Sequence, residues 1–163
     1  MRFLYPCEKY MPRFIRIFLS IICLFFATSV SASPVLEDMS GQKVSFSDLQ
    51  GKWVLINYWA SWCQSCIDEI AELNHFYETK KNNVVLFAVN YDALPIDMQQ
   101  QLIEQFDIRY PSLQHDPGRS LQLGSIRGVP VTFVFNPEGK LSNTLYGGQT
   151  AESLKEALAM NMR

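Results

Sequence analysis

Two cysteines one helical turn apart, placed directly after an apolar run, constrain this chain more than any other feature. Residues 59–66 have the sequence WASWCQSC. The preceding run, Trp53–Tyr58, is short and rich in β-branched and aromatic side chains, which predicts a buried strand. From Ser65 onward, apolar residues recur at spacings of three and four, which predicts an amphipathic helix packed on a sheet. Cys63 is therefore expected at the strand-to-helix turn, at the helix N-terminus.

This placement of the two thiols predicts redox chemistry. Unpaired backbone N–H groups and the positive end of the helix dipole stabilise a thiolate at a helix N-terminus. The thiolate is the form that attacks disulfides. We therefore predict that Cys63 is the attacking residue and that Cys66, one turn further along, resolves the mixed disulfide.

A metal site and a purely structural disulfide are the alternatives for such a pair. A closed zinc site needs about four ligands, whereas two of the four cysteines, Cys7 and Cys23, fall in a predicted leader. His75 and His115 are isolated in the sequence and are expected to be surface or satisfied polar residues. A disulfide across so short a loop would stabilise the fold only weakly. The sequence predicts neither a metal nor another cofactor.

The N-terminus has the order of a secretory signal. Four basic residues in the first 16 positions precede an apolar run at 17–30 and small residues at 31–33. The run is shorter than the ~20 residues that span a bilayer. We predict a signal peptide over residues 1–32, cleaved after Ala32, and one folded domain over 33–163. An uncleaved anchor remains the alternative, with membrane contact only in that case.

Charge and size narrow the functional class of the protein further. Without the predicted leader, ten basic and fifteen acidic residues remain, and no basic stripe suggests a nucleic acid partner. A chain of 163 residues without repeats can bury a core unaided. An exported protein whose remaining cysteines form one close pair is expected to use it for redox work.

The rest of the chain alternates between predicted strands and helices. An apolar run predicts a central parallel strand, a periodic stretch predicts a helix, and two strands around a turn at 136–139 predict an antiparallel pair. A final helix follows, with Thr150 as its cap. In chain order these elements are a hairpin near Val35 and Val44, then Val84–Asn90, Met98–Phe106, Val131–Phe135, Leu141–Tyr146 and Ala151–Met160.

Together these residues resemble the thioredoxin superfamily, and within it the TlpA/ResA-like (DsbE-like) extracytoplasmic thiol–disulfide oxidoreductases. The resemblance extends from about residue 35 to 158 and rests on Trp62, the Cys-x-x-Cys pair and the segment 128–133. It implies an α/β thioredoxin-like fold, with a central mixed sheet flanked by helices, an N-terminal β-hairpin and a central insertion at 92–118. Three aromatic residues in or beside that insertion are expected in the core: Tyr91, Phe106 and Tyr110.

The resemblance also implies the residues around the disulfide. Pro130 would be a cis proline lying against the Cys63–Cys66 disulfide, where it exposes the backbone of Val129 to an incoming substrate chain. Trp62, Val129 and Pro130 would then bind substrate. The alternative is that Pro130 only begins a strand.

Two polar positions separate this chain from thioredoxin itself. Asn57 stands where thioredoxins have a buried aspartate, and Glu69 matches a glutamate of the TlpA/ResA-like group three residues after the second cysteine. Because residues three apart share a helix face, Glu69 is a candidate to accept the proton of Cys66. A solvated surface carboxylate is the alternative.

Two departures from the group concern prolines. Ser65 and Ala71 occupy positions where relatives commonly have proline. The residues between the cysteines tune thiolate stability and redox potential. Gln64 and Ser65 therefore leave the direction of electron flow open.

The predicted function is a thiol–disulfide oxidoreductase of the bacterial periplasm or cell envelope, acting as a reductase in cytochrome c maturation or in general disulfide reduction. The partners would be protein disulfide substrates and a membrane thiol-transfer electron donor. A disulfide-introducing oxidant is the main alternative. A copper(I)-handling module is less well supported, because copper carriers of this fold space their cysteines by three residues and add a histidine. A peroxidase would need a threonine where Ala60 stands.

Overall fold

The computed structural model describes residues 33–80 and 82–160. The predicted signal peptide lies outside these residues, and the domain boundary after Ala32 stays a prediction. The elements follow in the order β1 (Val35–Glu37), β2 (Lys43–Ser45), η1 (Phe46–Leu49), β3 (Trp53–Trp59), α2 (Gln64–Lys80), β4 (Val84–Asn90), α3 (Ile96–Gln105), β5 (Val131–Phe135), β6 (Leu141–Tyr146) and α4 (Ala151–Met160).

One mixed sheet organises the described residues. Its strand order is β4-β3-β5-β6, while β1 and β2 form a separate hairpin. β3 and β4 are parallel, and the β3–β5 and β5–β6 pairs are antiparallel. The predicted mixed sheet and N-terminal hairpin are therefore confirmed. Because β3 and β4 are parallel, their carboxyl ends lie at the same end of the sheet, and the cysteines follow β3 at this end.

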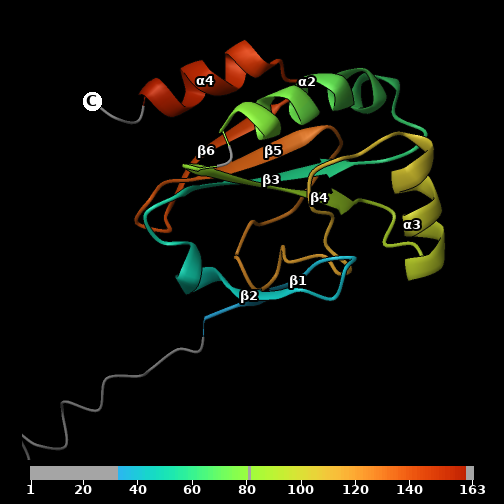
Figure 1. Cartoon of the computed structure of the whole chain (residues 1–163), viewed down its shortest axis with the longest axis horizontal. Helices are drawn as coiled ribbons and strands as arrows, with labels where there is room; N and C mark the ends of the chain where they lie inside the picture. The colour runs from blue at the N-terminus through green and yellow to red at the C-terminus, as the bar shows by residue number, and fades with distance from the viewer. Residues whose placement is uncertain (1–32, 81, 161–163) are drawn as a thin grey trace, which may run out of the picture. The chain divides into compact units, whose positions relative to one another are not determined.

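The sheet separates two cores. Figure 1 shows α2 and α4 over one face and the β1–β2 hairpin on the other. Successive side chains of β3 point to opposite faces, so Leu55 and Trp59 pack with α2 and α4, while Ile56 and Tyr58 pack with the hairpin side. Burial of both faces explains why β3 and β4 are continuous apolar runs.

The ends of the two later helices follow local chemistry. Thr150 Oγ1 accepts a hydrogen bond from the Ser153 N–H at 3.1 Å, and Ser153 Oγ accepts one from the Thr150 N–H at 2.9 Å. This reciprocal cap confirms Thr150 as the start signal of α4. α3 begins two residues earlier than predicted, directly after Pro95. Proline is compatible with a helix start because its missing N–H is not needed there.

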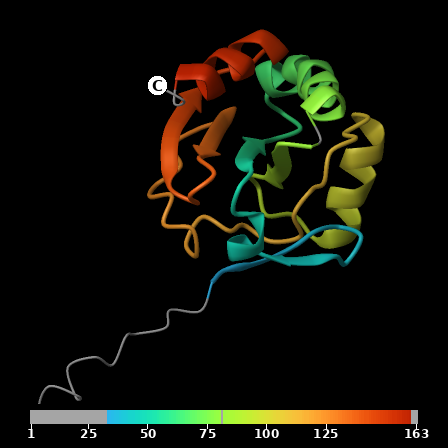
Figure 2. The same cartoon turned by 60° about the vertical axis from the view of Figure 1, so that its left-hand side comes forward.

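The predicted insertion packs along the β4 edge of the sheet. It contains α3, which Figures 1 and 2 both place beside that edge. Ser112 then pairs with Ala88 of β4 in parallel, and Leu113 pairs with Asp38 near the hairpin. Tyr110 is buried, and the Phe106 ring meets the Trp59 ring edge-on at 5.8 Å. The insertion therefore closes the core, as expected for these two aromatic residues.

Candidate active site

Cys63 caps the N-terminus of α2. Its carbonyl accepts the first helical hydrogen bond, from the Ile67 N–H at 3.1 Å, and its Sγ accepts the N–H of Cys66 at 3.2 Å. This is the geometry of an N-cap residue, with sulfur in place of the usual oxygen. The Cys63 sulfur therefore lies where the helix dipole and free N–H groups favour negative charge.

The two cysteines form a disulfide, and the residues differ in exposure. The Cα atoms are 5.3 Å apart. Cys63 is 6% exposed, whereas Cys66 is completely buried. An incoming thiolate can reach Cys63 first, which agrees with the roles predicted for the two residues.

Two polar groups lie near the Cys63 sulfur besides Cys66. The Val129 carbonyl oxygen lies 3.6 Å from Sγ, and the hydroxyl oxygen of Ser65 lies 3.5 Å from it. The Val129–Pro130 peptide bond is cis, and Pro130 is buried directly before β5. The sequence separates Val129 from Cys63 by 66 residues, and pairing of β3 with β5 brings them together.

Trp62 forms the exposed wall beside the disulfide. It is 64% exposed, yet its indole N–H donates to both carboxylate oxygens of Asp92, at 2.9 and 3.1 Å. The Tyr91 ring meets the indole edge-on, with 6.4 Å between centroids. The prediction that Tyr91 belongs to the core is wrong, since Tyr91 is 38% exposed. It follows β4 directly and lies at the sheet edge that carries the site.

Glu69 is buried inside the protein. Its side chain is on the α2 face that meets β3, and the residue is 3% exposed. Asn57 Nδ2 donates to Oε1 at 2.8 Å, and the backbone N–H of Gln149 donates to Oε2 at 2.7 Å. Asn57 also donates to the Thr132 hydroxyl at 3.0 Å. The solvated-carboxylate alternative is therefore wrong.

Burial changes the acidity of Glu69. Desolvation disfavours the charged carboxylate and raises the pKa of Glu69 to about 7, against the lowering effect of the hydrogen bonds from Gln149 and Asn57. A carboxylic acid with a pKa near neutrality can take up and release a proton at working pH. Glu69 lies one turn along α2 from Cys66, on the same side of the helix.

Two residues that contribute to the site, Asp92 and Gln149, were not predicted from the sequence. Asp92 was placed only in the insertion, although it follows the end of β4. The carboxyl ends of parallel strands converge at one edge of a sheet, and this rule would have indicated Asp92 and Tyr91. Gln149 offered no signal, because its contribution is a backbone N–H.

Metal ligation and membrane insertion have no support in residues 33–80 and 82–160. Within them no group of three or more His, Cys, Asp or Glu side chains could hold a metal ion. His75 and His115 are both exposed. Over the same ranges, every helix is too short or too polar to cross a membrane.

The fold and the site together define a thioredoxin-like protein with a Cys-x-x-Cys disulfide. Residues 28–144 match the AhpC/TSA family, and since they are more than half of the chain, the chain belongs to this family. It is similar to the thiol–disulfide oxidoreductase ResA of Bacillus thuringiensis subsp. konkukian, with 29% identity over 125 residues, 76% of this chain and 72% of that protein. It is also 29% identical to ResA of Bacillus subtilis over 123 residues, 75% of this chain and 68% of that protein.

Solved structures support the fold. StoA of Bacillus subtilis superposes with a TM-score of 0.60 and 28% identity, over 78% of this chain and 98% of StoA. The exposed lipoprotein thioredoxin Etrx1 of Streptococcus pneumoniae superposes with a TM-score of 0.69 over 79% of this chain and 99% of Etrx1. At 22% identity, Etrx1 supports the fold alone. The predicted thioredoxin-like fold and thiol–disulfide oxidoreductase class are confirmed.

Proposed function

We propose that this protein reduces disulfide bonds of other proteins in the bacterial cell envelope, through Cys63 and Cys66. The observation that carries the proposal is the position of the Cys63 sulfur. It caps α2, it belongs to the more exposed cysteine of the pair, and it lies near the Val129 carbonyl and next in sequence to the exposed Trp62. Trp62, Val129 and Pro130 would bound the surface that receives the substrate chain.

In the reduced protein, the Cys63 thiolate attacks one sulfur of the target disulfide. A Cys63–target disulfide forms, and the other target sulfur leaves as a thiolate that takes up a proton. Cys66 then loses its proton and attacks Cys63 Sγ. The Cys63–Cys66 disulfide forms, the second target sulfur leaves, and two electrons have passed to the target.

Glu69 is the proposed acceptor of the Cys66 proton. Its pKa of about 7, raised by burial, suits a group that takes up a proton near neutrality. Its oxygens are held by Asn57 and Gln149, which would fix the carboxylate while the proton moves. Glu69→Gln should slow resolution of the mixed disulfide and leave the attack by Cys63 unchanged.

The proposed location and partners are inferred from the predicted signal peptide and from the similarity to thiol–disulfide oxidoreductases. The predicted signal peptide would export the chain to the periplasm, where a membrane thiol-transfer protein would return the site to its dithiol form. Apocytochromes before haem attachment and mispaired envelope proteins are the proposed substrates. Both present disulfides in extended or unfolded segments, which a shallow surface such as that around Trp62 can accept.

The redox potential of the Cys63/Cys66 pair tests the direction of electron flow. We would equilibrate the full-length chain with dithiothreitol or glutathione and quantify both states on the peptide that contains the two cysteines. A value near about −270 mV, as in thioredoxin, supports a reductase. A value near about −120 mV would replace the proposal with a disulfide-introducing oxidant.

Trapping tests the order of the two cysteines. Cys63→Ser should abolish exchange, because the accessible nucleophile is lost. Cys66→Ser should accumulate Cys63–target disulfides, since nothing resolves them. If the Cys66→Ser protein releases targets as fast as the parent, Cys66 is not the resolving residue.

A further inference from the structure

Beside the disulfide lies an open hollow of about 600 Å³ that none of the proposed steps uses. Tyr91 and Ile126 both line it, with Tyr58 and Arg119 among the remaining lining residues. Tyr91 touches Trp62, the neighbour of Cys63. Ile126 precedes Val129 by three residues, and the Val129 carbonyl faces the Cys63 sulfur. The hollow is therefore linked to the site by Tyr91 through Trp62 and by the short segment from Ile126 to Val129.

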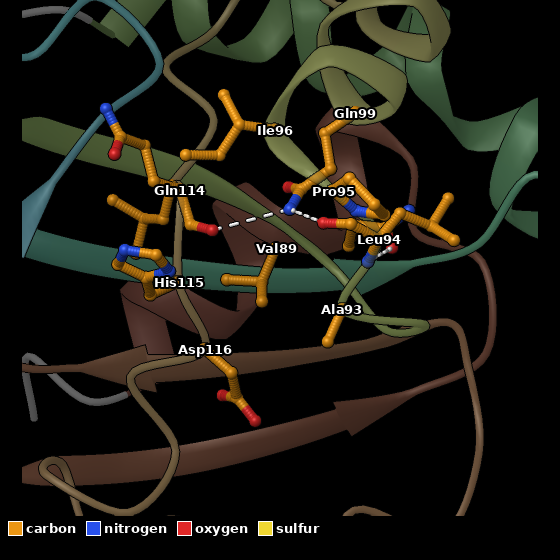
Figure 3. A pocket seen from close by; sticks show the side chains of 11 residues that line it. Val89, Ala93, Leu94, Pro95, Ile96, Gln99, Gln114, His115 and Asp116 are labelled. Atoms are coloured by element: carbon orange, nitrogen blue, oxygen red, sulfur yellow. Dashed lines mark hydrogen bonds between the residues drawn. The ribbon is translucent and has the colours of Figure 1, made fainter.

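Three residues that line the hollow, Tyr58, Asp116 and Gly118, are hydrogen-bonded to one another. The Tyr58 hydroxyl donates to Asp116 Oδ1 at 2.5 Å, and the Gly118 N–H donates to the same oxygen at 2.7 Å. A Cβ on Gly118 would lie 3.0 Å from that oxygen and 3.2 Å from the Tyr58 hydroxyl, so only glycine fits without a shift. In Figure 3 the Asp116 side chain extends away from Gln99 and Ile96. Its carboxylate is thus held by two donors.

The backbone around the hollow adopts a conformation that L residues seldom take. Gln122 has φ of 55°, and Gly124 follows with φ of 75°. A positive φ at a residue with a side chain costs free energy, and such positions concentrate at binding sites. Both residues line the hollow.

Charge indicates what the hollow binds. Arg119 lines it and forms no ion pair with any carboxylate in the described residues, where the ion pairs involve Lys43, Arg109 and Lys155. The stretch 117–137 contains no Asp or Glu but includes Arg119 and the exposed Arg127. Asp116 also lines the hollow, but its Oδ1 already accepts the Tyr58 hydroxyl and the Gly118 N–H, and the Asp92 carboxylate accepts the Trp62 indole N–H. Of the two charged residues that line the hollow, Asp116 is therefore held by groups of the protein itself, whereas Arg119 has no ion pair in the described residues and is available to a ligand.

We propose that this hollow binds an acidic side chain of the substrate polypeptide close to its disulfide, with Arg119 as the residue that selects it. The inference rests on the proposed function, because the ligand is the protein that exchanges its disulfide at Cys63. A guanidinium pairs with a carboxylate through directed hydrogen bonds, and the open hollow leaves room for the side chain to reach it.

The test uses the reduced full-length chain and three synthetic peptides that share one internal disulfide. The peptides differ only next to a cysteine, where they have Glu, Gln or Lys, and the series is made for each side of the disulfide. The rate constant for reduction at limiting peptide is compared at low and high salt. We expect Glu to exceed Gln by about three- to tenfold on one side, with a smaller ratio at high salt because ions screen exposed charges.

Arginine variants assign the preference to the hollow. Arg119→Ala should bring the Glu/Gln ratio close to one, Arg119→Lys should retain part of it, and Arg119→Glu should favour the Lys peptide. Arg109→Ala is the matched control, because Arg109 is already paired with Glu78 and Asp107. It should keep the parent ratio.

Three results would overturn the inference. The first is an unchanged ratio in Arg119→Ala. The second is an equal loss in Arg127→Ala, which would show a diffuse positive field in place of the hollow. The third is a parent protein that reduces all peptides equally well. A parent protein that exchanges with no peptide would overturn the proposed function itself, which distinguishes the two failures.

Discussion

Two buried asparagines on neighbouring parallel strands, Asn57 of β3 and Asn90 of β4, have different roles. Each has one amide atom that is buried and without a partner in the described residues, Oδ1 in Asn57 and Nδ2 in Asn90. Asn57 donates to a carboxylate, that of Glu69. Asn90 accepts from two backbone N–H groups, of Asp92 at 3.1 Å and Leu94 at 3.5 Å.

The Asn90 side chain accepts hydrogen bonds from the backbone, and no hydrogen bond to a carboxylate is found for it in the described residues. It helps to line a pocket of about 370 Å³ between the end of β4, the start of α3 and residues 113–116. Figure 3 shows the Gln99 amide reaching the carbonyl oxygens of Leu94 and Gln114, at 2.6 and 3.4 Å. These hydrogen bonds connect a side-chain amide to backbone carbonyl groups, and they hold the segment that follows β4 in place.

The difference teaches where this fold obtains its chemistry. A buried amide that bonds to backbone fixes geometry but does not titrate. A buried amide that holds a carboxylate keeps a titrating group inside the protein, beside the redox cysteines. Asn90 still serves the site, because it holds the Asp92 backbone and the Asp92 side chain holds Trp62.

The largest loss of stability is expected from placing a second carboxylate beside Glu69. Asn57→Asp would put two carboxylates at hydrogen-bond distance in the core, since Asn57 and Glu69 are 2.8 Å apart. At about pH 8 we expect a loss of roughly 3 kcal/mol or more in unfolding free energy, and at about pH 5, where a shared proton bridges the pair, a much smaller loss. Urea unfolding at both pH values measures this.

Asn90→Asp is the matched control for that variant. Its retained oxygen keeps the two backbone donors, which favour a charged carboxylate, and no glutamate bonds to it. Its loss of stability should depend much less on pH. Equal pH dependence in the two variants would show that burial alone, and not the Glu69 partner, distinguishes the regions.

Glu69→Gln sharpens the comparison by removing the titrating group. The raised folded pKa of Glu69 means that the folded protein holds a proton that the unfolded chain releases above its ordinary pKa of 4.5. Wild-type stability is therefore lost as pH rises from about 4.5 to 7, by on the order of 2 to 3 kcal/mol from this group.

The Glu69→Gln variant should lack this fall in stability. Its unfolding free energy, measured across the same pH range, should gain on that of the parent protein as pH increases. Glu72→Gln is the control, because Glu72 is an exposed carboxylate on the same helix. A constant difference between Glu69→Gln and the parent across pH would refute the raised pKa.

Asn90→Ala tests the role of the buried amide that binds only backbone N–H groups among the described residues. Two backbone N–H groups would lose their acceptor, so we expect a loss of about 1 to 2 kcal/mol that is the same at every pH. The redox potential should stay unchanged, while Trp62 fluorescence should shift as Asp92 is released. A changed potential with unchanged fluorescence would contradict the assigned role.

The smallest effect is expected at Ser65. Its hydroxyl can donate to the Cys63 sulfur, 3.5 Å away, and such a bond is stronger to the thiolate than to the disulfide. Ser65→Ala should stabilise the disulfide relative to the dithiol about three- to tenfold, which makes the potential about 15 to 30 mV more negative. Ser65→Thr should restore it, and Gln64→Ala should leave it nearly unchanged.

Much of the fold could be predicted because three strands of its main sheet, β3, β4 and β5, are buried on both faces. Val84–Asn90, Val131–Phe135, Leu141–Tyr146 and Ala151–Met160 have the predicted bounds. β3 runs one residue further than predicted, to Trp59, and α2 begins at Gln64. Helix ends were less certain, as α3 shows, because local capping decides them. Tyr91 was assigned to the core because an aromatic residue after an apolar strand has the same local pattern whether it is buried or at the rim.

The sequence by itself determined the redox pair, the strand-to-helix turn that holds Cys63 and the choice of Pro130 and Glu69 as candidates. The redox pair and the turn follow from residue type and from spacing within one turn of chain, whereas Pro130 and Glu69 follow from the resemblance to the TlpA/ResA-like proteins. Only the tertiary structure decided that Glu69 is buried against Asn57, that Asp92 holds Trp62 and that Arg119 lines a hollow beside the disulfide. These contacts join residues 12 and 30 positions apart in two cases, and burial depends on the sheet that brings distant segments together.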